Sequence, residues 1–116
     1  MIKRVYLDYA AATPVDPRVK KAMDEFSALG FANPAGLHEE GLFAKRALEL
    51  ARKTIADFIG VKAPEIIFTS SATESNNLAI LGAARANVKS GKHLITTSAE
   101  HVSVLNVFKQ LEKEGF

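Results

Sequence analysis

The chain has 116 residues, of which 47% are hydrophobic and 24% are charged, with 15 Lys and Arg against 13 Asp and Glu. This composition is typical of a folded globular domain and excludes a disordered or low-complexity chain. The net charge of +2 argues against a nucleic-acid partner, the lack of cysteine excludes disulfides and thiolate metal sites, and no apolar run could span a membrane. We therefore expect a cytoplasmic protein.

The first 30 residues are predicted to form an N-terminal arm and one helix. Val5–Tyr9 is short and β-prone, whereas the spacing of apolar residues after it changes to that of an amphipathic helix. Asp16 is a suitable N-cap for this helix, because Pro17 tolerates the first helical position. Gly30 is expected to end the helix.

A second, longer helix is predicted in the middle of the chain. Residues 31–36 consist mainly of turn formers and should form a loop. The apolar positions from Ala44 to Ile59 then form one stripe, with charged residues over much of the remaining surface. Gly60 follows as the C-terminal glycine of this helix.

The rest of the chain is predicted to alternate strands and helices. The short apolar runs Glu65–Thr69 and His93–Thr97 are typical of buried strands, and helices should follow them from about Thr73 to Val88 and from near His101. This alternation predicts an α/β fold with a parallel-rich sheet. Two central strands alone would leave sheet edges and helix faces uncovered. We therefore expect residues 1–116 to be the N-terminal segment of a longer protein and to form an incomplete fold by themselves.

Small hydroxyl residues join the first predicted strand to its helix. The first backbone N–H groups of a helix lack internal partners and carry a partial positive charge, which makes them suitable donors to a phosphate. Thr73 and a neighbouring serine could add hydroxyl hydrogen bonds. The alternative is that Ser71 or Thr73 only caps the helix.

His101 is the second candidate, because it lies where the second predicted strand enters its helix. The carboxyl ends of parallel strands meet at one edge of a sheet, so His101 and Thr73 should lie on the same edge. An imidazole there could stack on a flat cofactor or transfer a proton, and the alternative is a solvated histidine. The histidines lack metal-ligand spacing, so we predict no metal site.

Four segments resemble, in the same order, the N-terminal part of a cysteine desulfurase of the NifS/IscS type. That family belongs to the class V aminotransferases of fold type I, which use pyridoxal 5'-phosphate. The matching segments are Tyr6–Pro17, Phe31–His38, Ile67–Asn77 and Glu100–Leu105. The resemblance implies that residues 1–116 are the start of the cofactor-binding large domain.

The resemblance also assigns roles to individual residues. It implies that Ala72 and Thr73 bind the cofactor phosphate, through backbone and hydroxyl respectively. It further implies that His101 stacks on the pyridine ring and assists proton transfer as a catalytic residue. Asn33 and His38 would lie near the substrate entrance.

The sequence departs from the family pattern at three positions. Ser71 and Ala32 stand where the family has glycine, and Ala12 stands where it has threonine. An alanine at position 32 would be strained if that position needed a positive φ. The family's Schiff-base lysine, which follows a histidine, and its nucleophilic cysteine are not found in residues 1–116. We therefore expect this segment to be inactive by itself.

The implied activity is the conversion of L-cysteine to L-alanine. The sulfur would pass as a persulfide to an iron–sulfur scaffold or another acceptor protein, for iron–sulfur cluster assembly or tRNA thiolation, and the intact enzyme would be a homodimer. Neither a nucleic acid nor a membrane is expected as a direct partner. The alternatives are a selenocysteine lyase, another class V aminotransferase, or a non-catalytic remnant that serves as an interaction module.

Overall fold

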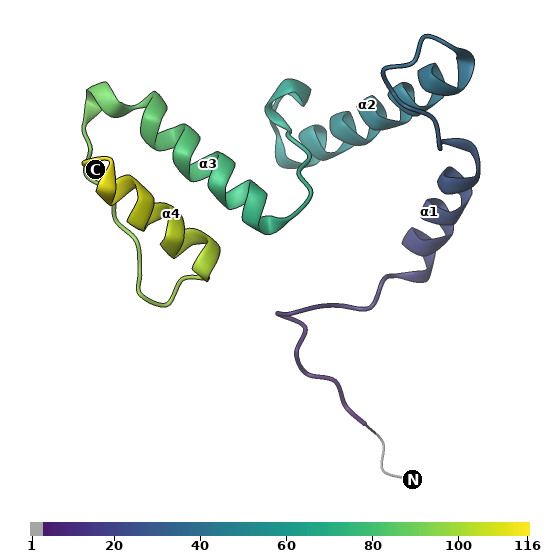
Figure 1. The fold of residues 1–116 in the computed structure, drawn as a ribbon. Coiled ribbons are helices and arrows are strands. Elements are labelled where there is room, and N and C mark those ends of the chain that lie inside the picture. Colours follow the sequence, from purple (N-terminus) through teal and green to yellow (C-terminus); the bar gives the residue numbers. More distant parts are fainter. Residues whose placement is uncertain (1–3) are drawn as a thin grey trace. The chain divides into compact units, whose positions relative to one another are not determined.

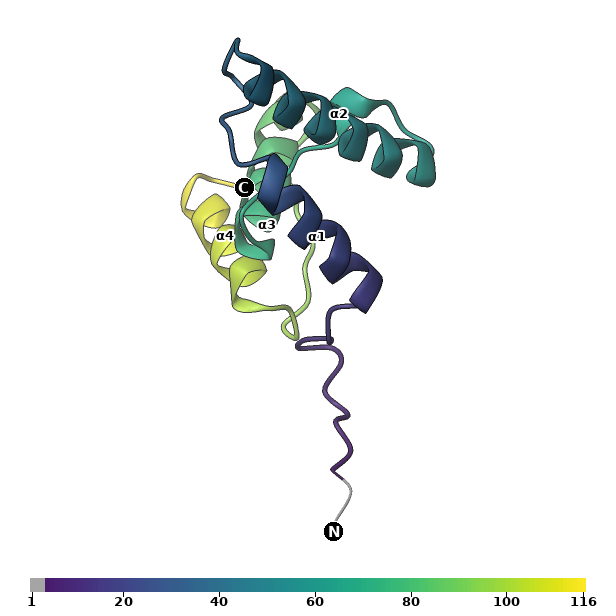
Figure 2. The ribbon, with the colours of Figure 1, turned by 90° about the vertical axis from the view of Figure 1, so that its right-hand side faces the viewer.

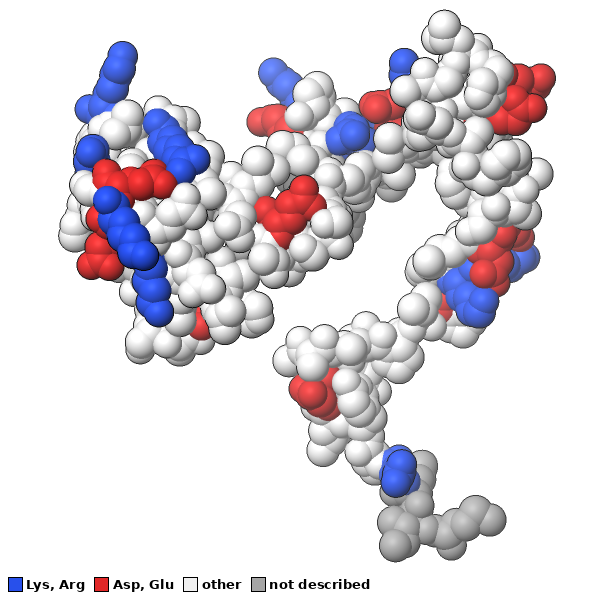
Figure 3. Space-filling view, viewed as in Figure 1, with Lys and Arg blue, Asp and Glu red and all other residues white. Residues whose placement is uncertain are grey.

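The computed structural model describes residues 4–116, which fall into two compact units that meet in the chain between Ile66 and Ile67. The first unit contains the helices α1 and α2, and the second contains α3 and α4 (Figure 1). None of these helices has the length and apolar character needed to cross a membrane. On the face shown in Figure 3, acidic and basic side chains lie next to one another over α1 and over the second unit.

Helix α1, Pro17–Leu29, begins and ends as its sequence predicts. The Asp16 carboxylate accepts a hydrogen bond from the Arg18 N–H at 2.8 Å, which satisfies one of the unpaired donors of the first turn. At the other end, the Gly30 N–H donates to the Phe26 carbonyl. Both predicted signals, the N-cap and the terminal glycine, are confirmed.

Helix α2, Glu39–Ile59, ends as predicted but begins before the apolar stripe. Gly60 adopts φ 75°, the left-handed conformation expected of a C-terminal glycine. The helix starts early because His38 caps it, accepting a hydrogen bond from the Gly41 N–H at 3.2 Å. Acidic residues in the first turn, Glu39 and Glu40, favour the same start through the helix dipole.

Glycine at position 41 lets the preceding loop pack against the start of α2. A Cβ atom on Gly41 would lie 2.6 Å from the Gly36 carbonyl oxygen and 2.9 Å from that of Asn33. Both distances are under 3.0 Å, which is shorter than Cβ atoms approach backbone atoms in proteins. Only glycine therefore fits at this position without moving the loop. The loop is thus held by backbone packing.

The second unit consists of α3, Ala72–Ala86, and α4, Val102–Lys113, with a short 3-10 turn at Val88–Ser90 after α3. The helices lie side by side in both ribbon views (Figures 1 and 2). Asn76, near the start of α3, bonds to Ser103 near the start of α4. Arg85 bonds to Glu114 at the opposite ends. The two helices therefore run parallel.

A small apolar core holds these two helices together. Leu111 is fully buried and Val107 is 2% exposed, and both pack with Ala84 of α3. The partly buried residues around them are Ile80, Leu81, Leu94 and Phe116. Every buried side chain of this cluster comes from α3 or α4, so the cluster fixes the distance between the two helices.

The predicted strands are not confirmed. Ala63–Glu65 is a 3-10 helix, and residues 66–69 and 91–97 carry no regular secondary structure, nor do residues 4–8. A strand is defined by ladder hydrogen bonds to a neighbouring strand, and residues 4–116 form no such ladder. The expected alternation of parallel strands and helices is therefore not seen, although each helix of that pattern is present.

Leu111→Ala should destabilise the polypeptide in which residues 1–116 occur by about 2–5 kcal/mol, because it removes a fully buried side chain and leaves a cavity. Val102→Ala in the same helix is the matched control, since Val102 is 61% exposed, and should change the free energy of unfolding by about 0.5 kcal/mol or less. Urea unfolding measures both. Equal losses would contradict the assigned core.

Candidate functional site

Ser71 caps α3, and this confirms the capping alternative for that residue. Its backbone is extended, and its Oγ accepts a hydrogen bond from the Glu74 N–H at 3.2 Å. The Glu74 carboxylate reaches back to the Ser70 N–H and the Ser70 hydroxyl, both at 2.7 Å. These two bonds, the backbone one first, hold the pKa of Glu74 below its ordinary value.

Capping leaves several donors free at the start of α3. Among residues 4–116, no group accepts a hydrogen bond from the N–H of Ala72, the N–H of Thr73 or the Thr73 hydroxyl. Both residues are exposed. Two backbone N–H groups and a hydroxyl at the positive end of a helix are suitable donors for a phosphate, so the residues present fit the phosphate of pyridoxal 5'-phosphate.

His101 lies at the start of α4 and is its N-cap. Its Nδ1 accepts a hydrogen bond from the Ser103 N–H at 3.2 Å and lies 2.8 Å from the Ser103 Oγ. The same Oγ accepts a hydrogen bond from the Asn76 side chain at 2.9 Å. Through Ser103, His101 is thus connected to Asn76 near the start of α3, although the sheet edge on which His101 and Thr73 are predicted to meet is not seen in residues 4–116.

The first unit holds the two residues predicted near the substrate entrance. The Asn33 side chain accepts a hydrogen bond from the Ala35 N–H at 2.9 Å, and His38 caps α2 and lies 2.9 Å from the Glu40 carboxylate. These contacts give both residues a local structural role. No residue other than glycine among 4–116 has a positive φ, so the strain considered for Ala32 is not present.

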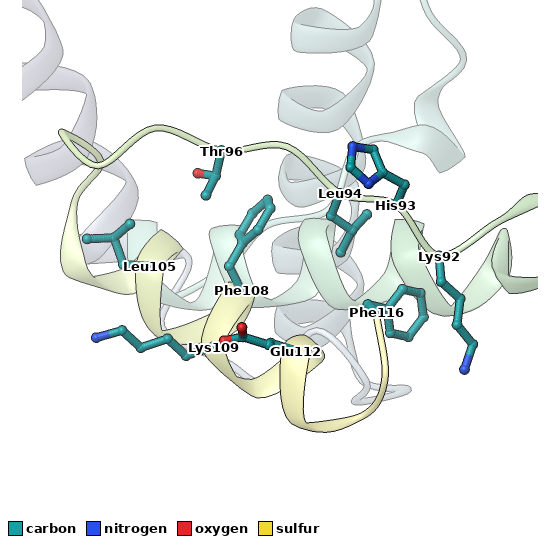
Figure 4. A pocket seen from close by; sticks show the side chains of 9 residues that line it. All are labelled: Lys92, His93, Leu94, Thr96, Leu105, Phe108, Lys109, Glu112 and Phe116. Carbon is teal, nitrogen blue, oxygen red and sulfur yellow. The ribbon is translucent and has the colours of Figure 1, made fainter.

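An open groove of about 370 Å³ lies between residues 92–96 and α4 (Figure 4). Leu94, Phe108 and Phe116 give it an apolar wall. Neither Thr73 nor His101 lines it. The candidate site is therefore a set of exposed groups at two helix starts and not this groove. No group of three or more metal-ligating side chains is found within residues 4–116.

Sequence reasoning did not single out Asn76 or Ser103. Both lie inside predicted helices, where polar residues usually face water, and the contact between them joins positions 27 apart. The serine two positions after His101 could have indicated the contact. The side chain of a helix N-cap commonly accepts a hydrogen bond from the backbone N–H two or three residues further on. Gly41, which fits the loop of Asn33, was missed in the same way.

The comparisons with known proteins identify the family of this chain. The sequence profile described as aminotransferase class-V matches residues 5–116. The chain therefore belongs to the class-V aminotransferase family, whose members are pyridoxal-phosphate-dependent enzymes.

Within that family, the chain is 52% identical over 115 residues to proteins named cysteine desulfurase IscS from Escherichia coli O139:H28 and Shigella boydii serotype 18. It also resembles a solved structure described as a NifS-like protein, with a TM-score of 0.85 and 40% identity over 98% of this chain. The match covers 97% of this chain and 28% of each IscS, and 31% of the NifS-like chain. The likeness supports fold type I for this part.

Glu74→Gln should lower the thermal stability of the polypeptide at neutral pH. The pKa of Glu74 is lower in the folded state than in the unfolded chain, so its carboxylate stabilises the fold above its ordinary pKa. That contribution is lost as the pH falls through the lowered pKa, and the difference between parent and variant should then shrink.

Thermal unfolding over a series of pH values between neutral and acid measures this effect. Glu112→Gln is the control, because Glu112 is an exposed glutamate of α4 whose carboxylate has no bonding partner among residues 4–116. It should change stability little at any pH. A Glu74→Gln difference that stays constant on acidification would refute the assigned carboxylate contacts.

Proposed function

We propose that this chain is the cofactor-anchoring part of a cysteine desulfurase, which converts L-cysteine to L-alanine and passes the sulfur as a persulfide to an acceptor. The family membership, and the identity of 52% to proteins named cysteine desulfurase, support this proposal. The observation that carries it in the chain itself is the set of free donors at Ala72 and Thr73 beside the start of α4.

In this proposal Ala72 and Thr73 hold the phosphate of pyridoxal 5'-phosphate. The N–H groups of the two residues would donate from the backbone and the Thr73 hydroxyl from its side chain. When bound, the cofactor supplies an electron sink for the carbon next to the substrate amine. The chain's task here is to fix the anionic end, so that the ring lies at a constant distance from α4.

His101 would cover one face of the cofactor ring and hold or move a proton near the substrate. Its side chain is exposed, although its Nδ1 edge is tied to Ser103. Nε2 has no bonding partner among residues 4–116 and is therefore available for proton transfer. Asn33 and His38 of the first unit are proposed to lie near the substrate entrance.

The remaining parts of the proposal concern the whole enzyme. We propose a cytoplasmic homodimer that supplies sulfur to an iron–sulfur scaffold or another acceptor protein, for cluster assembly or tRNA thiolation. The covalent lysine and the nucleophilic thiol are not assigned to any residue of 1–116, which contains no cysteine. Residues 1–116 by themselves are accordingly proposed to be inactive.

Thr73→Val should weaken the binding of pyridoxal 5'-phosphate by about 10- to 100-fold, because it removes a hydroxyl bond to a charged group. It should leave the binding of unphosphorylated pyridoxal nearly unchanged. Thr69→Val is the matched control, since the Thr69 hydroxyl is already bonded to Ser75 and Ser71. Absorbance titrations with both compounds measure the effect, and a wild type without preference for the phosphorylated form would refute the proposal.

His101→Ala should reduce the rate of alanine formation from L-cysteine by about 10²- to 10⁴-fold, the range for loss of a proton-transferring group. His93→Ala is the control, because His93 is exposed and lines the groove, whereas His101 does not. The assay uses the native polypeptide that carries residues 1–116, loaded with cofactor. Equal rates for both variants would contradict the role of His101, and no alanine from the wild type would contradict the reaction.

A further inference from the structure

Ser103 is a buried polar residue of α4 whose contacts lead to His101. Only 5% of the residue is exposed, and its hydroxyl oxygen lies between two side chains. The Asn76 amide donates to it at 2.9 Å, and the Nδ1 of His101 lies 2.8 Å on the other side. The three side chains therefore form one hydrogen-bonded chain from α3 to the start of α4.

The direction of each hydrogen bond in this chain follows from the donors available. The Ser103 oxygen accepts the Asn76 N–H, so its own proton is free to point at the Nδ1 of His101. The Ser103 backbone N–H, which can only donate, points at the same Nδ1 from 3.2 Å. With two donors directed at it, Nδ1 is an acceptor, and the proton of the neutral ring lies on Nε2.

His38 provides a contrast within the same chain, because it also caps a helix through Nδ1. The Gly41 N–H donates to this nitrogen, whereas the Glu40 carboxylate 2.9 Å away can only accept. One partner requires a bare nitrogen and the other a protonated one. The environment of His38 therefore fixes no single tautomer, whereas that of His101 does.

We propose that Ser103 and Asn76 are positioning residues that hold the imidazole of His101 in its Nε2–H form and in one orientation. The inference rests on the proposed function, in which this ring stacks on the cofactor. Nδ1 is anchored against buried Ser103, whereas Nε2 has no bonding partner among residues 4–116 and the residue as a whole is exposed. The imidazole is then already oriented before the cofactor binds, so binding does not have to restrict its rotation.

The test uses the native polypeptide that carries residues 1–116, prepared without cofactor and with ¹⁵N in its histidine rings. In the wild type, the Nδ1 of His101 should resonate as a bare acceptor and its Nε2 as a protonated nitrogen. Exposed His93 should give signals averaged between the two tautomers. Ser103→Ala should move the His101 signals toward those of His93, and Ser103→Thr, which keeps the hydroxyl, should restore them.

Asn76→Asp reverses the direction of the hydrogen bonds from residue 76 through Ser103 to His101. It keeps a side chain of similar size at position 76. An aspartate at position 76 accepts the proton of the Ser103 hydroxyl, so the serine oxygen turns its lone pairs toward Nδ1. The fraction of His101 protonated at Nδ1 should therefore rise. Asn77→Asp adds the same charge one residue further on, where the native amide bonds only within α3, and should not change the His101 signals.

In titrations of the cofactor-free protein, Ser103→Ala should weaken the binding of unphosphorylated pyridoxal by about three- to tenfold, the effect of one lost hydrogen bond. Wild-type His101 signals equal to those of His93, or no response to either Ser103→Ala or Asn76→Asp, would overturn the proposal. A wild type with no phosphate-dependent cofactor binding would instead overturn the proposed function, and the ring signals of the cofactor-free protein would show whether the positioning itself holds.

Discussion

The packing of Leu111 and Val107 of α4 against Ala84 of α3 is the contact on which the candidate site depends. It presses two helices together in parallel, so that their first turns lie at the same end. Parallel packing also places both positive helix ends together, which is favourable only where negative charge or hydrogen-bond acceptors gather. The apolar core thus places the two helix starts at the same end, although no residue of the buried cluster belongs to the candidate site.

The two helix starts are satisfied in different ways, and this difference gives each of them a separate task. At α3 the cap is a serine, and the N–H groups of Ala72 and Thr73 have no acceptor among residues 4–116. At α4 the cap is a histidine, whose ring is tied through Nδ1 to buried Ser103. One helix start therefore has free donors for the proposed phosphate, while the other has an imidazole bonded through Nδ1.

The features that could be predicted from the sequence are those with local causes. Asp16 and Gly60 specify helix ends within a few residues of themselves, and both act as expected. Strand pairing and the contact between Asn76 and Ser103 depend on positions far apart in the chain, which periodicity does not record. The resemblance across four ordered segments carried the family assignment, because it draws on residues that no local rule connects.

The competing interpretations of the α3 start, a capped helix or a phosphate site, prove compatible once its donors are counted. Among the unpaired N–H groups of this helix start, that of Glu74 donates to the Ser71 Oγ, whereas the Glu74 carboxylate binds the N–H of Ser70, which precedes the helix. Ser71, at the position where the resemblance implies a glycine, is therefore used by the cap, and its Oγ accepts the Glu74 N–H. The N–H groups of Ala72 and Thr73 have no acceptor among residues 4–116, so the cap leaves them available to the proposed phosphate.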